Sequence, residues 1–247
     1  SIDAIRAGGL DLSVVSSSYA ISTASMAAYR WRFQEANQTL EAPYQSTESN
    51  PPAPHTTAIG PFGVGYGVWD DEEYDVMFYG PELGFGMHLN QQGDLSNFEM
   101  LKVAMGGSSL YGHWAPEGPL REKLYTQTTA YLEQRPDTYV AGLIWFQGFN
   151  DQFEDEGKEA YAANLKRLIR DYRETYGENV PVVVVQARKY ADLAVIAEAQ
   201  KAVADEDARV GLAESDGLTE CFHYDAGSQL VIGQRVGVEM LQLLDEN

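Results

Sequence analysis

The chain has 247 residues, enough for one large α/β domain or two small ones and for a sizeable hydrophobic core. Its 37 acidic and 17 basic residues give a formal net charge of -20, which disfavours nucleic acid and anionic membranes as partners. A single cysteine, Cys221, excludes an internal disulfide, and no apolar run reaches the roughly 20 residues of a membrane-spanning helix.

The first 96 residues show little regular patterning. Residues 10–22 predict a first strand, and a segment rich in Pro, Gly, Ser and Thr follows it. We interpret residues 35–79 as a long loop excursion from a single domain that covers residues 1–247. Because this loop carries aromatic side chains such as Tyr66 and Trp69, we expect it to be ordered and to line the substrate.

From residue 97 onward, strand and helix patterns alternate. The predicted strands are residues 97–107, 138–148, 179–188 and 208–215, and the predicted helices are residues 117–135, 157–177, 193–207 and 227–247. The run of four valines at 182–185 does not alternate with polar residues, which is typical of a strand covered on both faces. Strands separated by helices predict βαβ units, and therefore an α/β fold with a parallel sheet.

Polar residues and glycines follow these strands, at the edge of the sheet where open α/β proteins bind ligands. Gly106 and Gly107 end the first of them, and Gln147 and Asn150 follow the core of the second. Each could be an ordinary turn or capping residue. Together, glycine amides and the Gln147 side-chain amide are the kind of donors that form an oxyanion hole.

A histidine and a carboxylate near the end of the chain complete a set of hydrolase groups. His223 can act as a general base, and Glu220, three residues earlier, can reach the other ring nitrogen and stabilise the imidazolium. Asp216 is an alternative acid. His113 precedes Trp114, where a substrate-lining role and a packing role are both open. No histidine or cysteine cluster has metal-ligand spacing, so we expect neither a metal nor another cofactor.

Four motifs in order carry a resemblance to a known family. They are "GPELGFGMHL" at Gly80–Leu89, "LKVAMGGSSLYGHW" at Leu101–Trp114, "LIWFQGFND" at Leu143–Asp151 and "ECFHYDAGSQLVIGQRVGVEM" at Glu220–Met240. In these segments the chain resembles the sialate O-acetylesterase-like carbohydrate esterases of the SGNH hydrolase superfamily. The resemblance covers about residues 80 to 240.

The resemblance implies a three-layer α/β/α sandwich with a central parallel sheet. It also implies removal of acetyl groups from sugars by a Ser-His-acid triad and an oxyanion hole, with no metal. Matched by position, His223 is the base, Glu220 is the acid, and Gln147 with Gly106 or Gly107 binds the oxyanion. Trp114 and Asn150 are expected to line the substrate together with the aromatic loop residues.

The nucleophile is where the chain departs from the family pattern. The Gly-Gln-Ser-Asn-Met motif is absent, and the nearest stretch is "ISTASMAAYRW" at Ile21–Trp31. Aligning Met26 with the family's methionine leaves Ala24 at the nucleophile position, whereas one deletion would make Ser25 the nucleophile; Ser22 is a third choice. A second departure is Phe149, where the family usually has glutamate.

Two functions from different classes follow. The first is an acetylesterase with Ser25, His223 and Glu220 as its triad, acting on an acetylated oligo- or polysaccharide. The second keeps the fold without a nucleophile and is a catalytically inactive carbohydrate-binding or structural protein. The expected location is secreted or periplasmic, and neither nucleic acid nor a membrane is an expected partner.

Overall fold

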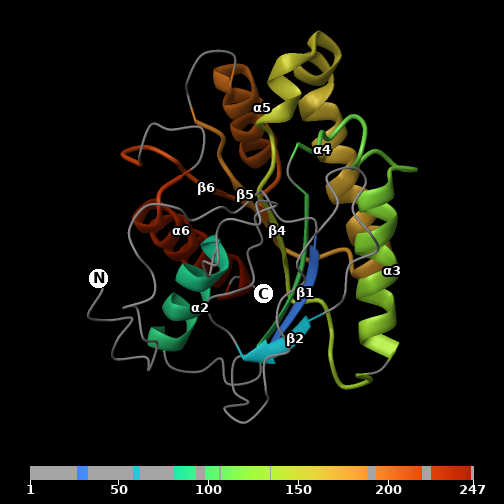
Figure 1. Ribbon diagram of the computed structural model, residues 1–247, viewed down its shortest axis with the longest axis vertical. Coiled ribbons are helices and arrows are strands. Elements are labelled where there is room, and N and C mark those ends of the chain that lie inside the picture. The colour runs from blue at the N-terminus through green and yellow to red at the C-terminus, as the bar shows by residue number, and fades with distance from the viewer. Residues whose placement is uncertain are drawn as a thin grey trace, which may run out of the picture. The chain divides into compact units, whose positions relative to one another are not determined.

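The structure is a computed structural model that describes residues 27–32, 58–61, 80–92, 98–105, 107–133, 135–188, 193–218 and 224–245 (Figure 1). Its contacts divide the chain into two compact units. The first comprises Ser1–Gly106 and Leu218–Gly237, and the second comprises Gly107–Gly217 and Val238–Asn247. That both belong to one domain stays a prediction.

The first unit contains a three-stranded sheet in the order β2-β1-β3. The central strand β1 (Ala27–Arg32) runs parallel to β2 (Ala58–Pro61) and antiparallel to β3 (Glu99–Ala104). The strand expected at residues 97–107 is present as β3. β1 was not expected, and the strand expected at 10–22 lies outside the described residues. Of the excursion at 35–79, only β2 is described.

Helix α2 (Pro81–Gln92) packs closely against the first half of helix α6 (Ala226–Asp245) in the same unit. Glycines on both helices make this approach possible, because a Cβ at Gly84 would collide with the backbone of Leu230 and one at Gly233 with the backbone of Pro81. His88 of α2 is buried, close to where a side chain at Gly237 of α6 would lie.

The second unit contains a parallel sheet in the order β4-β5-β6. Its strands are β4 (Leu143–Trp145), β5 (Val182–Val185) and β6 (Val210–Ala213). All four valines of β5 are buried, as their unbroken apolar run predicts. The helices of this unit are α3 (Pro119–Glu133), α4 (Asp155–Tyr176), α5 (Leu193–Glu206) and the end of α6.

Helices cover both faces of this parallel sheet. A Cβ at Gly211 of β6 would contact Leu243 of α6, and Gly211 pairs in register with Val183 of β5. Side chains alternate between faces along a strand, so Trp145, which pairs with the next residue of β5, points the other way. Its indole N–H donates to the Tyr161 hydroxyl of α4 at 3.3 Å.

Helix α3 lies on the α4 side of the sheet, as Figure 1 shows. Tyr125 of α3 and Tyr172 of α4 are in edge contact with ring centroids 5.9 Å apart, and Arg121 pairs with Asp171 at 2.5 Å. Helix α5 lies on this side too, because Gln200 donates to Tyr161 at 3.1 Å. The predicted α/β fold, with parallel strands between layers of helices, is confirmed.

Candidate active site

Two segments that follow strands lie against each other in the second unit. One is Gly107–Leu110, after β3, and the other is Gln147–Asp151, after β4. The Gln147 amide Nε2 donates to the Ser108 carbonyl at 2.9 Å, and the Leu110 backbone N–H donates to both carboxylate oxygens of Asp151 at 3.0 Å. These hydrogen bonds join the two segments; that they belong to a catalytic site stays a prediction.

Asp151 is the residue that joins the two segments. Its side chain is 0% exposed, and it accepts from the Leu110 N–H and, at 2.5 Å, from Gln147 Nε2. Burial raises the pKa of Asp151, while hydrogen bonds from the Gln147 side chain and from backbone N–H groups of Leu110 and Tyr111 oppose that rise. Asp151 thus clamps one loop to the other from inside the protein.

A second set of hydrogen bonds, made by uncharged side chains of α4 and α5, holds the same segment. The Gln147 backbone carbonyl accepts from the Tyr161 hydroxyl of α4 at 2.8 Å and from Gln200 Nε2 of α5 at 3.0 Å. Burial raises the pKa of Tyr161 far above its ordinary value, so the hydroxyl stays protonated and can donate. Two helices therefore fix one carbonyl at the end of β4.

Gly148 is required where these two helices meet. Its φ of 147° is one that residues with a side chain rarely adopt. A Cβ there would lie 2.8 Å from the Ile196 side chain and 3.2 Å from the Tyr161 hydroxyl. The glycine lets the chain leave β4, pass close to α4 and α5, and enter the short 3-10 helix η2 (Asn150–Phe153).

The side-chain amides of this segment have different partners. Gln147 Nε2 has two hydrogens, and both have acceptors, the Ser108 carbonyl and Asp151. Asn150 is half-buried, and its Nδ2 would lie 3.6 Å from a Cβ at Gly107, so its amide faces the backbone of the Gly107 turn. No described residue accepts a hydrogen bond from Asn150 in the structure.

Trp114 belongs to the packing around this site. The side chain is 5% exposed, its ring meets Trp145 edge-on with centroids 5.1 Å apart, and its indole N–H donates to Ser108 Oγ at 3.0 Å. These contacts hold the Gly107–Leu110 segment against β4. Stacking of Trp114 on a substrate, which would need exposed ring surface, remains only a prediction.

His113 contacts Ser109, and the geometry of this contact indicates a structural role. The Ser109 backbone N–H donates to His113 Nδ1 at 3.2 Å, and the Ser109 hydroxyl is 3.4 Å from the same nitrogen. Ser109 is buried, and the ring nitrogen that faces it already accepts from the backbone. Of the two roles left open for His113, this geometry favours packing.

Most of the predicted catalytic residues lie outside the described residues. These are Ser25 with its alternatives Ser22 and Ala24, the pair His223 and Glu220, the glycine Gly106, and the loop aromatics Tyr66 and Trp69. Their roles stay predictions. Asp216, the alternative acid, is described and exposed. Among the described residues no group of three or more His, Cys, Asp or Glu could hold a metal, and no described helix is long and apolar enough to span a membrane.

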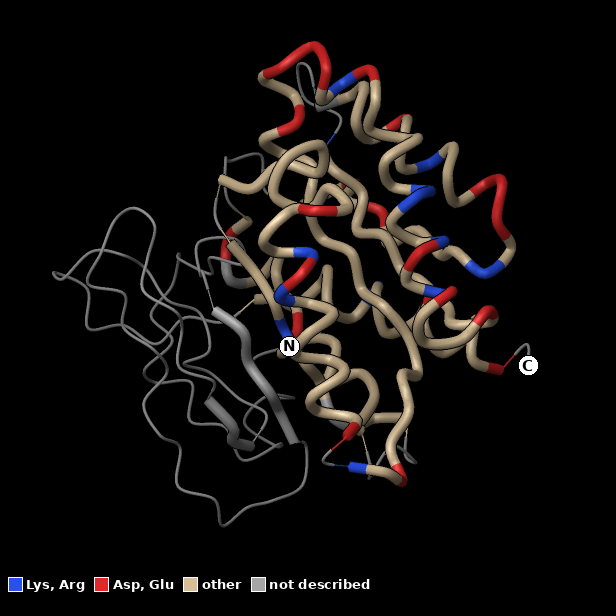
Figure 2. Tube along the Cα trace, turned by 90° about the vertical axis from the view of Figure 1, so that its right-hand side faces the viewer, with Lys and Arg blue, Asp and Glu red and all other residues tan. Residues whose placement is uncertain are grey.

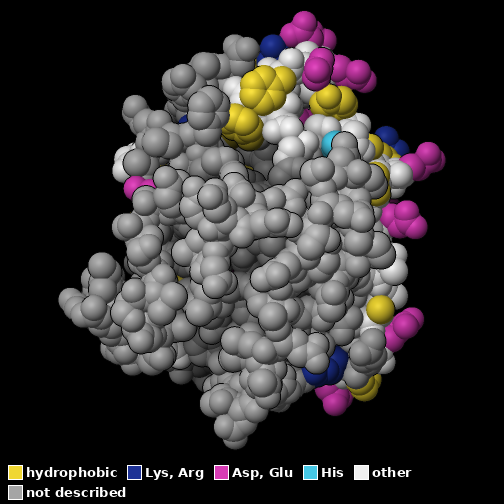
Figure 3. Space-filling view, in the orientation of Figure 1, with side chains coloured by type: hydrophobic (Ala, Val, Ile, Leu, Met, Phe, Trp, Pro, Cys, Tyr) yellow, Lys and Arg dark blue, Asp and Glu magenta, His cyan; other side chains and the backbone are white. Residues whose placement is uncertain are grey.

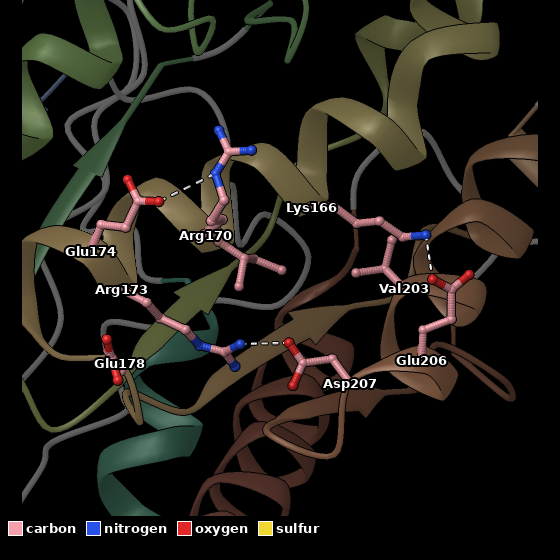
Figure 4. Close-up of a pocket in the computed structure, with 9 residues that line it drawn as sticks. Lys166, Arg170, Arg173, Glu174, Glu178, Val203, Glu206 and Asp207 are labelled. Carbon is pink, nitrogen blue, oxygen red and sulfur yellow. Dashed lines mark hydrogen bonds and ion pairs between the residues drawn. The ribbon is translucent and has the colours of Figure 1, made fainter.

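A groove of about 450 Å³ lies between α4 and α5 at the opposite end of this sheet (Figure 4). It is lined by Lys166, Ile169, Arg170, Arg173, Glu174, Glu178, Val203, Glu206 and Asp207. Its cations are paired, as with Lys166 to Glu206 and Arg173 to Asp207, both at 2.5 Å. Figure 2 shows the same mixing of acidic and basic residues along the helices. Nothing in this groove resembles a catalytic arrangement.

The network partners Tyr161, Asp151 and Gln200 were not singled out as site residues from sequence. In the sequence, Tyr161 cannot be told from the other residues on the apolar face of its helix. Gln200 offered a signal, because it shares the inward face of α5 with Ile196 and Val203, at spacings of four and three residues. A lone polar residue on a buried helix face needs an internal partner, and here that partner is the end of β4.

The structure is that of an α/β protein in which the segments that follow β3 and β4 are joined by buried hydrogen bonds. A model of the family "carbohydrate esterase, sialic acid-specific acetylesterase" matches residues 29–242. The chain therefore belongs to this carbohydrate esterase family, and the resemblance seen in the four motifs is confirmed.

Comparison with solved structures supports the fold. The chain is similar to a protein from Arabidopsis thaliana determined by X-ray diffraction at 1.6 Å, with a TM-score of 0.58 and 21% sequence identity. The match covers 70% of this chain and 72% of that chain. At this identity the likeness shows the fold alone. Comparison with curated proteins finds no match.

Proposed function

We propose that this protein is a serine esterase that removes acetyl groups from carbohydrates. Ser25 is the proposed nucleophile, His223 the general base and Glu220 the acid that orients the imidazole. Membership of the carbohydrate esterase family supports the reaction class. The triad itself rests on the sequence motifs, because its three residues lie outside the described part of the chain.

The observation that carries the proposal is the clamp between Gly107–Leu110 and Gln147–Asp151. An oxyanion hole needs donors that are fixed before charge develops, so that no reorganisation is required during the reaction. Buried Asp151 supplies that rigidity by binding the Leu110 N–H and the Gln147 amide together. A loop held this way suits backbone amides, such as that of Gly107, for binding the oxyanion.

In the proposed reaction, Ser25 Oγ attacks the acetyl carbonyl carbon while His223 takes the hydroxyl proton. The negative charge that forms on the carbonyl oxygen is stabilised by the amides of Gly106 and Gly107 and by a side-chain amide. His223 then gives its proton to the sugar oxygen, which leaves as an alcohol. Water next attacks the acetyl-enzyme with His223 again as base, releasing acetate and restoring Ser25.

Two residues compete for the side-chain amide role. Gln147 was expected to donate, yet it would have to release Ser108 or Asp151 to do so. The Asn150 amide faces Gly107 without such a commitment. Replacing each with alanine separates the two: loss of a transition-state donor lowers kcat about 10²–10³-fold with the fold intact, whereas loss of a structural strut lowers stability as well.

The direct test is turnover of p-nitrophenyl acetate and of an acetylated xylan or sialoside by the purified protein. We expect hydrolysis, abolished by Ser25→Ala and by His223→Ala and unchanged by Ser22→Ala. If Ser22→Ala abolishes turnover instead, the nucleophile is wrong but the reaction stands. A folded protein that hydrolyses none of these esters refutes the proposal.

The missing Gly-Gln-Ser-Asn motif favours one alternative, an inactive carbohydrate-binding protein with Ala24 at the nucleophile position. Without a hydroxyl there is no acyl-enzyme to form. A fluorophosphonate probe decides between the two functions. Covalent labelling that Ser25→Ala removes excludes the inactive protein, and binding of an oligosaccharide without any labelling supports it.

A further inference from the structure

Two phenylalanines flank Asn150 in the sequence of η2: Phe149 precedes this short helix and Phe153 ends it. Phe153 is 63% exposed, so most of its side chain is in contact with water. Its ring is in edge contact with Phe149, with centroids 5.4 Å apart and an interplanar angle of 76°. Figure 3 shows hydrophobic side chains gathered at the top of the view, where Figure 1 shows the chain entering α4.

The geometry of η2 puts Phe153 on the same side as Asn150. In a 3-10 helix, side chains three residues apart are eclipsed, and three residues rise about 6 Å along the axis. The two residues between them, Asp151 and Gln152, are buried, and Gln152 Nε2 donates to the Phe149 carbonyl at 2.8 Å. The turn thus divides into an inward side that anchors it and an outward side that carries an amide and a ring.

Contact with Phe149 makes this surface more than a single exposed residue. Isolated apolar side chains are common on protein surfaces, but a pair of touching rings next to a site is a feature of binding surfaces. Phe149 also stands where the resembled family usually has glutamate, so a charge has been replaced by a ring. The side chain at this position is therefore aromatic rather than charged.

We propose that Phe149 and Phe153 form an aromatic rim that binds the C–H face of the sugar ring carrying the acetyl group. This proposal rests on the proposed function and deepens it by assigning the sugar subsite. An aromatic ring offers a flat apolar surface with few rotatable bonds, so little conformational entropy is lost on binding. A pyranose ring held at this rim would place its ester toward the Asn150 amide and the Gly107 turn.

The test compares two acetyl esters, one with a sugar and one without. An acetylated xylooligosaccharide presents a ring, whereas ethyl acetate presents the same acetyl group alone. For Phe153→Ala we expect KM for the sugar ester to rise about tenfold, equivalent to about 1.4 kcal/mol, with kcat within about twofold. Turnover of ethyl acetate should not change. Phe153→Tyr keeps the ring and should restore the sugar ester to near wild-type kinetics.

A matched control is Tyr139→Ala, which removes an aromatic residue that is 79% exposed elsewhere in the same unit. It should change neither substrate. An equal loss on both esters in Phe153→Ala would overturn the rim, because it would mean that Phe153 positions Asn150. A loss that appears only with longer acyl chains on the same sugar would also overturn it, since the rim would then bind the acyl group.

Failure of the rim and failure of the proposed function are distinguishable. If the wild-type protein hydrolyses neither ester, the esterase is refuted, and the rim is then tested by calorimetric binding of the deacetylated xylooligosaccharide. Weaker binding by Phe153→Ala than by Tyr139→Ala supports the rim in that case too. If the wild type is active and Phe153→Ala matches it on the sugar ester, the rim alone is wrong.

Discussion

The two ends of the parallel sheet in the second unit use polar residues in opposite ways. At the carboxyl end, buried Asp151, Tyr161 and Gln200 hold the residues after β4 through hydrogen bonds of defined geometry. At the amino end, the groove between α4 and α5 carries ion pairs such as Lys166 with Glu206, both well exposed. The same helices connect the two ends.

Buried hydrogen bonds and exposed ion pairs differ in how firmly they fix the groups that they join. A buried polar group that loses its partner costs free energy, so each contact fixes the others. An exposed ion pair exchanges readily with water and salt and fixes little. We therefore expect substitutions at the carboxyl end to affect both stability and turnover, and substitutions in the exposed ion pairs of the amino end to affect neither by much.

The largest effect is expected from Asp151→Ala. It leaves the Leu110 N–H and one Gln147 hydrogen without an acceptor, and each buried unpaired group costs about 1–3 kcal/mol. We expect a clear loss in the free energy of unfolding by denaturant titration, and a fall in ester turnover of more than tenfold. Asp155→Ala is the control: that carboxylate lies at the exposed start of α4, and its loss should change stability by less than about 1 kcal/mol. Equal losses in both variants would contradict the clamp.

A smaller effect is expected from Gly148→Ala. The new Cβ would meet the Ile196 side chain at 2.8 Å on a backbone with φ 147°, so strain and crowding add. We expect a loss of about 1–3 kcal/mol in the free energy of unfolding. Gly217→Ala is matched to it, because Gly217 has φ 78° but no atom within 4 Å of its Cβ position. If both glycine variants lose the same stability, the close approach of α4 and α5 is not what requires Gly148.

The sequence predicts the scaffold better than it predicts this network. Apolar periodicity placed α3, α4, α5 and α6 and the valine strand β5, because each of these elements buries a face that its own residues define. The rule that ligands bind at strand ends led to Gln147 and Asn150. It did not show that the Gln147 amide is already used, since that depends on Asp151 and Ser108, which only the folded chain brings into contact.

The pH dependence of stability tests the buried carboxyl group of Asp151 more finely. Because burial raises the pKa of Asp151 above its ordinary value of 3.8, the folded protein holds this proton more tightly than the unfolded chain does. The contribution of Asp151 to stability is then greatest at low pH and falls as pH rises through the raised pKa. The control is Asp151→Asn, because the asparagine side chain has no ionisable carboxyl group. The difference in unfolding free energy, wild type minus variant, should fall from pH 4 upward and then level off. A difference that grows with pH would mean that the clamp favours the carboxylate.

The smallest effect is expected at the amino end, from Lys166→Ala. Both Lys166 and its partner Glu206 are exposed, so their ion pair should contribute no more than about 1 kcal/mol to the free energy of unfolding. A double-mutant cycle with Glu206→Ala measures the pair directly, and the coupling should shrink further in high salt. Ester turnover should stay at the wild-type level. Coupling as large as the loss in Asp151→Ala would erase the contrast between the two ends, because exposed charge would then order the sheet as firmly as the buried network does.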